Sequence, residues 1–122
     1  MNNRLHNLTN PYQGQARKVL CLCSAGLLRS PTAANVLHNR LGFNTRSAGV
    51  SHEYALIRVD GALIYWADEI VCMESWHKDS VVDIYGQDKP IHCLDIPDVY
   101  GWNDSELKEL VYNKYLEVAC SY

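Results

Sequence analysis

The residues best suited to chemistry in this 122-residue chain are Cys23 and Arg29, which are separated by five residues. An apolar run at residues 19–22 predicts a buried strand before the cysteine, and apolar residues at helical spacing after Pro31 predict a helix. A loop that joins a strand to a helix N-terminus can turn several backbone N–H groups toward one point. Such a loop binds an anion such as phosphate, and it would bring the thiol and the guanidinium to that anion.

The chemistry that these residue types favour is phosphoryl transfer. The planar guanidinium of Arg29 can bind two phosphate oxygens at once, and Cys23, as a thiolate stabilised by the same N–H groups, can attack phosphorus. Ser30 is expected to cap the helix and to donate a hydrogen bond to the sulfur. The predicted phosphate-binding loop consists of Ser24, Ala25, Gly26, Leu27, Leu28, Arg29 and Ser30.

The order Cys-x5-Arg-Ser-Pro, followed by a helix, resembles the phosphate-binding loop of the low-molecular-weight protein tyrosine phosphatases. The resemblance implies that Cys23 is the nucleophile, that Arg29 binds the phosphoryl group and that Ser30 tunes the thiolate. Two positions depart from the family pattern. Gly26 stands where asparagine is usual, and Leu28 stands where many members have a second cysteine. The family's usual disulfide protection of the nucleophile is therefore expected to be missing.

The segment after the fourth predicted strand contains the candidates for the general acid. Residues 94–102 resemble the family's Asp-Pro-Tyr segment, in which the aspartate protonates the leaving group. The Asp-x-Tyr register favours Asp98 as the acid and places Tyr100 in the wall of the substrate cleft. Asp95 is the alternative acid, because the proline here is Pro97, which precedes Asp98 instead of following it.

The segment after the second predicted strand resembles the opposite wall of that cleft. It follows Arg-Ser-Ala-Gly at residues 46–49, a sequence with which the family's second strand commonly ends. The candidate lining residues are His52 and Tyr54. The alternative interpretation of both is an ordinary exposed position without a role in the site.

Alternating strand and helix patterns predict a single α/β domain. Strands are expected at residues 17–22, 43–47, 67–75 and 90–94, and helices at 31–41, 53–59, 62–66, 76–85 and from Asn103 or Asp104 onward. Such units form parallel sheets with right-handed crossovers. The family resemblance implies a four-stranded parallel sheet of order 2-1-3-4 in a three-layer domain with helices on both faces. Cys23 would then begin its loop where the strand order reverses, the usual ligand crevice of such sheets.

Length and composition indicate one domain, residues 16–122, preceded by a flexible polar tail, residues 1–15. The hydrophobic fraction of 48% and the charged fraction of 20% are typical of a soluble globular protein. The net charge of −3 argues against a nucleic-acid partner. Five cysteines, mostly in apolar runs, and the lack of a signal-peptide or membrane-spanning pattern predict a cytoplasmic protein with no membrane partner.

These features predict a cysteine-dependent protein tyrosine phosphatase. Its substrates would be tyrosine-phosphorylated proteins or small aryl phosphate monoesters, hydrolysed through a phosphocysteine intermediate. No metal or organic cofactor is expected. The sequence leaves the natural substrate and the oligomeric state open.

Two other functions fit the same pattern. One is a phosphoprotein-binding module that has lost turnover. The other is an arsenate reductase, which needs resolving thiols to relay a disulfide from the nucleophile. Cys21 is expected to point to the opposite face of the strand from Cys23, and Cys72 and Cys93 are expected to be buried. A zinc site formed by Cys21, Cys23, His92 and Cys93 is disfavoured, because Cys-x-Cys is not the common zinc-knuckle spacing.

Overall fold

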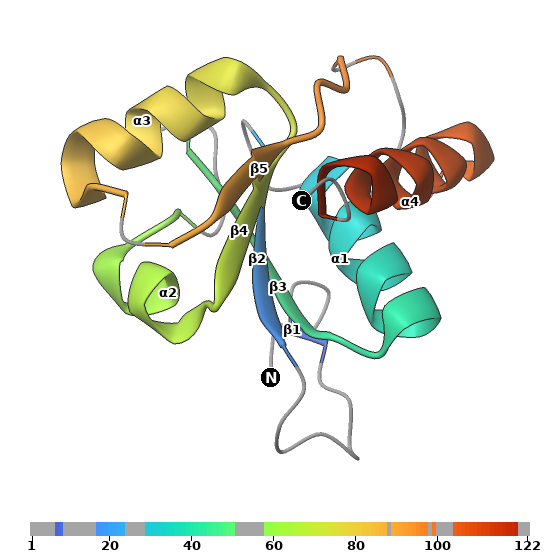
Figure 1. Ribbon diagram of the computed structural model, residues 1–122, viewed down its shortest axis with the longest axis horizontal. Helices are drawn as coiled ribbons and strands as arrows, with labels where there is room; N and C mark the ends of the chain where they lie inside the picture. Colours follow the sequence, from blue (N-terminus) through green and yellow to red (C-terminus); the bar gives the residue numbers. More distant parts are fainter. Residues whose placement is uncertain are drawn as a thin grey trace.

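The computed structural model describes residues 7–8, 17–23, 29–50, 58–87, 89–97, 99 and 104–119. Its elements, in chain order, are β1 (Asn7–Leu8), β2 (Lys18–Cys23), α1 (Arg29–Leu41), β3 (Asn44–Gly49), α2 (Gly61–Trp66), β4 (Glu69–Cys72), α3 (Ser75–Tyr85), β5 (Ile91–Cys93) and α4 (Ser105–Ala119). They form three layers, in which a twisted sheet separates α1 and α4 from α2 and α3 (Figure 1).

The described residues form one sheet with the strand order β1-β3-β2-β4-β5. β3, β2, β4 and β5 run parallel to one another, which confirms the predicted parallel sheet of order 2-1-3-4. β1 is an addition that the sequence did not predict. It pairs antiparallel with β3, with Asn7 opposite Arg46, in the segment expected to be a flexible tail. Two residues are too few to carry a recognisable strand pattern.

Each face of the sheet has its own hydrophobic core, because alternate residues of a strand point to opposite faces. Cys21 and Cys23 of β2 lie in the cluster that includes Leu37 of α1 and apolar residues of α4. Leu20 and Leu22 lie in the cluster on the other face, with apolar residues of α2 and α3. β2 is therefore buried on both sides, as its continuous apolar run predicts.

Three helix ends follow signals that are local in sequence. Gly42, with a φ of 74°, follows α1 at the predicted stop. Asp60 Oδ1 accepts a hydrogen bond from the Leu63 backbone N–H at the start of α2, at 2.8 Å. Asp104 caps α4 through two backbone N–H groups, which resolves the choice between the two expected caps.

The start of α1 differs from the prediction. The helix begins at Arg29 and not at Pro31, so Ser30 lies inside the first turn instead of capping it. Proline is compatible with this position, because the first-turn N–H groups of a helix have no intrahelical partner.

Two other predicted boundaries are also wrong. Arg58 was expected in a helix, but it forms a parallel bridge with Gly49. Val59, the last residue of that predicted helix, is also not helical and donates its backbone N–H to the Gly49 carbonyl oxygen. Residues 53–57 lie outside the described residues, as does most of the segment between β3 and α2. The strand expected at 67–75 is shorter at both ends, because Ala67 caps the end of α2 and α3 already begins at Ser75.

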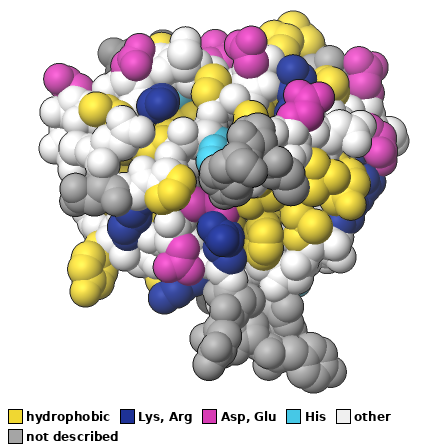
Figure 2. All heavy atoms as spheres, viewed as in Figure 1, with side chains coloured by type: hydrophobic (Ala, Val, Ile, Leu, Met, Phe, Trp, Pro, Cys, Tyr) yellow, Lys and Arg dark blue, Asp and Glu magenta, His cyan; other side chains and the backbone are white. Residues whose placement is uncertain are grey.

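The surface carries charges of both signs. On the face shown in Figure 2, acidic and basic side chains are interspersed among the described residues instead of forming a continuous basic patch. Among the described helices, none has the length and hydropathy needed to cross a membrane.

Candidate active site

The end of β2 and the start of α1 lie at the carboxyl edge of the parallel strands. After β2 the chain forms β3 on one side of it, and β4 later pairs with the other side of β2. The strand order therefore reverses at β2. Such a point is where open α/β sheets bind ligands. Cys23 is the last residue of β2 and Arg29 the first of α1, and both side chains are buried. The fold therefore places both predicted residues at this edge.

The thiol of Cys23 contacts the first turn of α1. Its Sγ forms a hydrogen bond with Ser30 Oγ at 3.2 Å. Ser30 Oγ also lies 3.4 Å from the Ala48 carbonyl oxygen, to which it can donate. Because a hydroxyl group rotates, Ser30 can instead donate to a thiolate when the cysteine loses its proton. Ser30 thus lies within hydrogen-bond distance of the sulfur, and its role as a donor to the thiolate stays a prediction.

The guanidinium of Arg29 is held by two segments that are distant in sequence. Arg29 is 1% exposed, and its Nη1 donates to Glu74 Oε2 at 2.5 Å and to the Ile96 carbonyl oxygen at 2.8 Å. Glu74 follows the end of β4 and Ile96 follows β5, so both contacts come from the same edge of the sheet as Cys23. They orient the arginine side chain within the protein interior.

Glu74 is the charged partner of that arginine. Burial by itself would raise the pKa of the Glu74 carboxyl, but the hydrogen bond and positive charge of Arg29 hold it below its usual value, with further help from His77 and Trp76. Trp76 Nε1 donates to Glu74 Oε1 at 3.2 Å, so the two oxygens of one carboxylate have different partners. Glu74 therefore remains an anion in mildly acidic solution.

Of the two candidate acids, Asp95 lies within the described residues. It is exposed and adopts a left-handed conformation, with a φ of 59°. Its neighbours continue the pairing with β4, since Leu94 N donates to the Cys72 carbonyl and Ile96 N to the Met73 carbonyl. Aspartate is among the residues that tolerate this backbone conformation. Asp95 therefore lies beside the residue whose carbonyl oxygen holds Arg29.

Several predicted site residues lie outside the described part of the chain. They are the loop residues Ser24, Ala25, Gly26, Leu27 and Leu28, the favoured acid Asp98, and the cleft candidates Tyr100, Tyr54 and His52. Their roles stay predictions.

Cys21 does not point away from Cys23, and the prediction that it does was wrong. Residues two apart on a strand face the same side, and both cysteines lie in the same core cluster. Burial, with the nearby Glu69 carboxylate, raises the pKa of the Cys21 thiol far above its ordinary value. Burial likewise raises the pKa of Cys72 to about 12. Both thiols are therefore neutral at physiological pH.

The described residues contain no cluster of side chains that could bind a metal ion. No three His, Cys, Asp or Glu side chains there are placed to hold a metal ion together. Cys23 instead contacts a serine hydroxyl.

Glu74, Trp76 and the Ile96 carbonyl are the parts of this edge that the sequence interpretation did not assign to the site. A signal for Glu74 was present, because an acidic residue just after a central strand lies at the same edge as a ligand loop. The Ile96 contact has no such signal, since any residue can supply a carbonyl oxygen.

Comparison with solved structures identifies the fold. The YwlE arginine phosphatase from Geobacillus stearothermophilus is 24% identical, with a TM-score of 0.66 over 86% of this chain and 94% of that one. Wzb from Vibrio vulnificus, in complex with benzylphosphonate, is 20% identical, with a TM-score of 0.68 over 87% and 99%. A low-molecular-weight protein tyrosine phosphatase from T. tengcongensis is 22% identical, with a TM-score of 0.64 over 84% and 99%.

No protein-family model and no curated protein sequence matches this chain. The structural matches nevertheless cover most of the chain and nearly all of each neighbour. The chain therefore has the fold of the low-molecular-weight protein tyrosine phosphatases, as its motif resemblance implied.

Proposed function

We propose that this protein is a cysteine-dependent phosphatase that hydrolyses phosphotyrosine or related aryl phosphate monoesters. The observation that carries the proposal is the placement of Cys23 and Arg29 at the ends of β2 and α1, with Cys23 Sγ hydrogen-bonded to Ser30. The fold supports it, because its solved neighbours include tyrosine and arginine phosphatases.

In the first step, the Cys23 thiolate attacks the phosphorus atom. A sulfur–phosphorus bond forms as the ester phosphorus–oxygen bond breaks, and the leaving phenolic oxygen takes a proton from Asp98. Arg29 and the loop N–H groups bind the phosphoryl oxygens, where negative charge must be stabilised in the transition state.

In the second step, water hydrolyses the phosphocysteine. The Asp98 carboxylate removes a proton from water, a phosphorus–oxygen bond forms, and the sulfur–phosphorus bond breaks. Inorganic phosphate and the thiolate are the products. Ser30, which lies 3.2 Å from the sulfur, stabilises the thiolate as it leaves.

The geometry supports hydrolysis better than arsenate reduction. A resolving thiol must reach the nucleophile and ionise, whereas Cys21 and Cys72 are buried and their pKa values are raised. Cys93, which was expected to be buried, is partly exposed, but it lies on β5, which β4 separates from β2. Cys21 is also a poor disulfide partner for Cys23, because Cα atoms two residues apart on a strand are separated by about 6.6 Å, near the upper limit for a disulfide.

The nucleophile is tested by Cys23→Ser. We expect the variant to lose more than about a thousandfold in para-nitrophenyl phosphate hydrolysis, measured with a chelator present at mildly acidic pH. It should still bind vanadate, because Arg29 and the loop remain. Cys93→Ser, which changes a partly exposed thiol on β5, is the matched control and should keep its rate. Near wild-type activity of Cys23→Ser would exclude Cys23 as the nucleophile. If the wild-type protein itself binds phosphate but does not hydrolyse the ester, the binding-module alternative is favoured.

The general acid is tested by comparing Asp98→Asn with Asp95→Asn. If Asp98 is the acid, Asp98→Asn should lower turnover of phosphotyrosine about a hundredfold or more, and Asp95→Asn should do much less. The loss should shrink on esters whose leaving group needs no proton. A leaving-group-dependent loss in Asp95→Asn alone would assign the acid to Asp95. Parallel assays with phosphoarginine peptides determine whether phosphotyrosine is the better substrate.

A further inference from the structure

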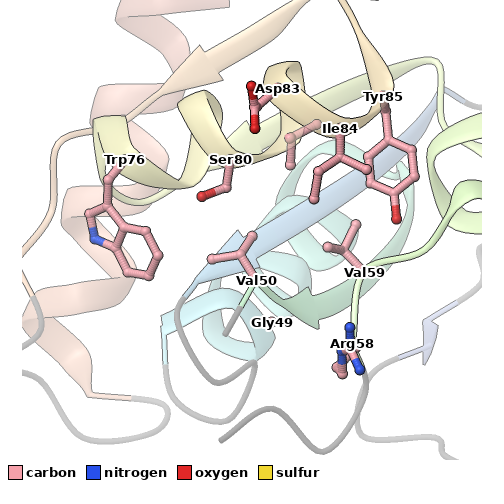
Figure 3. A pocket seen from close by; sticks show the side chains of 10 residues that line it. Gly49, Val50, Arg58, Val59, Trp76, Ser80, Asp83, Ile84 and Tyr85 are labelled. Carbon is pink, nitrogen blue, oxygen red and sulfur yellow. The ribbon is translucent and has the colours of Figure 1, made fainter. Parts of the chain in front are cut away.

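A groove of about 500 Å³ opens between α3 and the residues that flank the segment after β3 (Figure 3). Trp76, Ser80 and Ile84 line it from the α3 side, and Val50 and Val59 line it from the opposite side. Its volume is in the range of about 300–1,000 Å³ that is typical of ligand sites. None of these residues was assigned to the site from the sequence.

The groove adjoins the candidate active site at both of its walls. On one side, Val50 N donates to the Cys23 carbonyl oxygen at 3.0 Å. On the other, Trp76 Nε1 donates to Glu74, the same carboxylate that accepts a hydrogen bond from Arg29. Two residues that line the groove are therefore hydrogen-bonded to Cys23 and to the partner of Arg29.

The chemistry of the walls favours an apolar group. Trp76 is 43% exposed and Ile84 is 59% exposed, although both are large hydrophobic side chains. The groove also has polar groups, namely the hydroxyl of Ser80 and the charged side chains of Arg58 and Asp83, which suit a peptide segment better than a free hydrocarbon.

We propose that this groove binds an apolar side chain of the phosphorylated polypeptide, close in sequence to the phosphorylated residue. The inference rests on the proposed function and narrows its substrate class from aryl phosphates to phosphoproteins with a flanking hydrophobic residue. The contacts of the groove walls with Cys23 and with the Arg29–Glu74 pair support a substrate segment as the occupant. Gly49, which lines the groove beside Val50, pairs with Cys23 across neighbouring strands, which lie about 4.8 Å apart. At about 3.3 Å per extended residue, a flanking side chain within about three positions can reach the groove.

The test is a peptide scan with the full-length protein. Phosphotyrosine peptides carry one leucine, moved through about three positions on each side of the phosphotyrosine in a serine and glycine background. We expect leucine at one or two positions to raise kcat/KM about tenfold, chiefly by lowering KM, because burial of its side chain is favourable. Each rate is normalised to the same protein's rate on para-nitrophenyl phosphate.

Two variants show whether the groove is responsible. Ile84→Gln should abolish the leucine preference, and the exposure of Ile84 makes unfolding of this variant unexpected. Tyr65→Ser on α2 is the matched control, since Tyr65 is 87% exposed and lies outside the groove. It should keep the preference. Equal rates for all peptides, or an unchanged preference in Ile84→Gln, would overturn the proposal.

Binding measurements separate this proposal from the proposed function. Calorimetric titration with non-hydrolysable phosphonate analogues of the same peptides requires no turnover. A leucine preference in binding without hydrolysis would reject the phosphatase activity and support the groove. Hydrolysis of para-nitrophenyl phosphate with no leucine preference in binding or rate would reject the groove alone.

Discussion

At the scale of single residues, the ion pair between Arg29 and Glu74 connects the start of α1 to the residues that follow β4. A buried cation needs a partner, and removal of one member of such a pair leaves the other charge uncompensated. Arg29 is 1% exposed, whereas the Glu74 side chain is 33% exposed. Glu74 therefore positions Arg29, and under the proposed function we expect it to affect substrate only through the arginine.

Glu74→Gln tests this role without changing the size of the side chain. We expect turnover of para-nitrophenyl phosphate to fall about tenfold, because the amide can still accept a hydrogen bond but no longer carries the charge that orients Arg29. Steady-state kinetics checks the result. Asp79→Asn, which removes an exposed charge elsewhere on α3, is the control and should have no effect. An unchanged rate in Glu74→Gln would show that the negative charge of Glu74 is not needed to orient Arg29.

The same pair makes a prediction for pH. The pKa of Glu74 in the folded state lies below its ordinary value of about 4.3. Its contribution to stability is therefore complete above that ordinary value and is lost as the pH falls through the lower, folded-state pKa. Thermal unfolding of wild type and Glu74→Gln should differ most near neutral pH and converge in acid. A difference that persists or grows in acid would contradict the assignment.

At the scale of elements, a second buried polar cluster ties α4 to the sheet at the edge opposite Cys23. Glu69, at the start of β4, is 1% exposed. Its Oε1 accepts hydrogen bonds from Tyr115 Oη at 2.9 Å and Arg17 Nη1 at 3.1 Å, and His92 Nε2 lies 3.1 Å from its Oε2. Burial, together with the negative charge of Glu69, raises the pKa of the Tyr115 hydroxyl. That hydroxyl therefore stays protonated as a donor.

Tyr115→Phe should reduce stability while leaving catalysis unchanged. Loss of the hydroxyl removes one donor from a buried carboxylate, which costs about 1–3 kcal/mol. Urea unfolding measures this cost, and para-nitrophenyl phosphate hydrolysis at low urea measures catalysis. Tyr112→Phe on the same helix is the control, because Tyr112 contacts Arg40 through the face of its ring, which the substitution keeps. Equal stabilities of the two variants would show that the hydroxyl of Tyr115 is dispensable.

At the scale of the whole molecule, ligand binding at the β2–α1 loop should stabilise the entire domain. A ligand that binds only the folded state at one hundred times its Kd adds about 2.7 kcal/mol, or roughly 10 °C in Tm for a chain of this length. Differential scanning calorimetry with vanadate should show such an increase. Arg29→Lys should lose most of it, because a point charge cannot replace the two-pronged guanidinium. The same increase in both proteins would mean that vanadate binds elsewhere.

The sequence by itself determined the parallel sheet, its order through the motif resemblance, and the placement of Cys23 and Arg29 between a buried strand and a helix. These features depend on interactions between near neighbours: strand and helix periodicity, capping residues and the loop between β2 and α1. The same reasoning should have placed Cys21 and Cys23 on one face, since that too follows from strand periodicity. Asp98 remains a sequence-based assignment.

Only the tertiary structure decided what surrounds the arginine. Arg29 contacts Glu74 across 45 positions and the Ile96 carbonyl across 67 positions of the chain. The strand β1 depends in the same way on pairing with β3 and not on its own two residues. Such contacts arise because the fold brings the ends of β4 and β5 to the edge where β2 ends, and no local pattern specifies which side chain or carbonyl will then face the guanidinium.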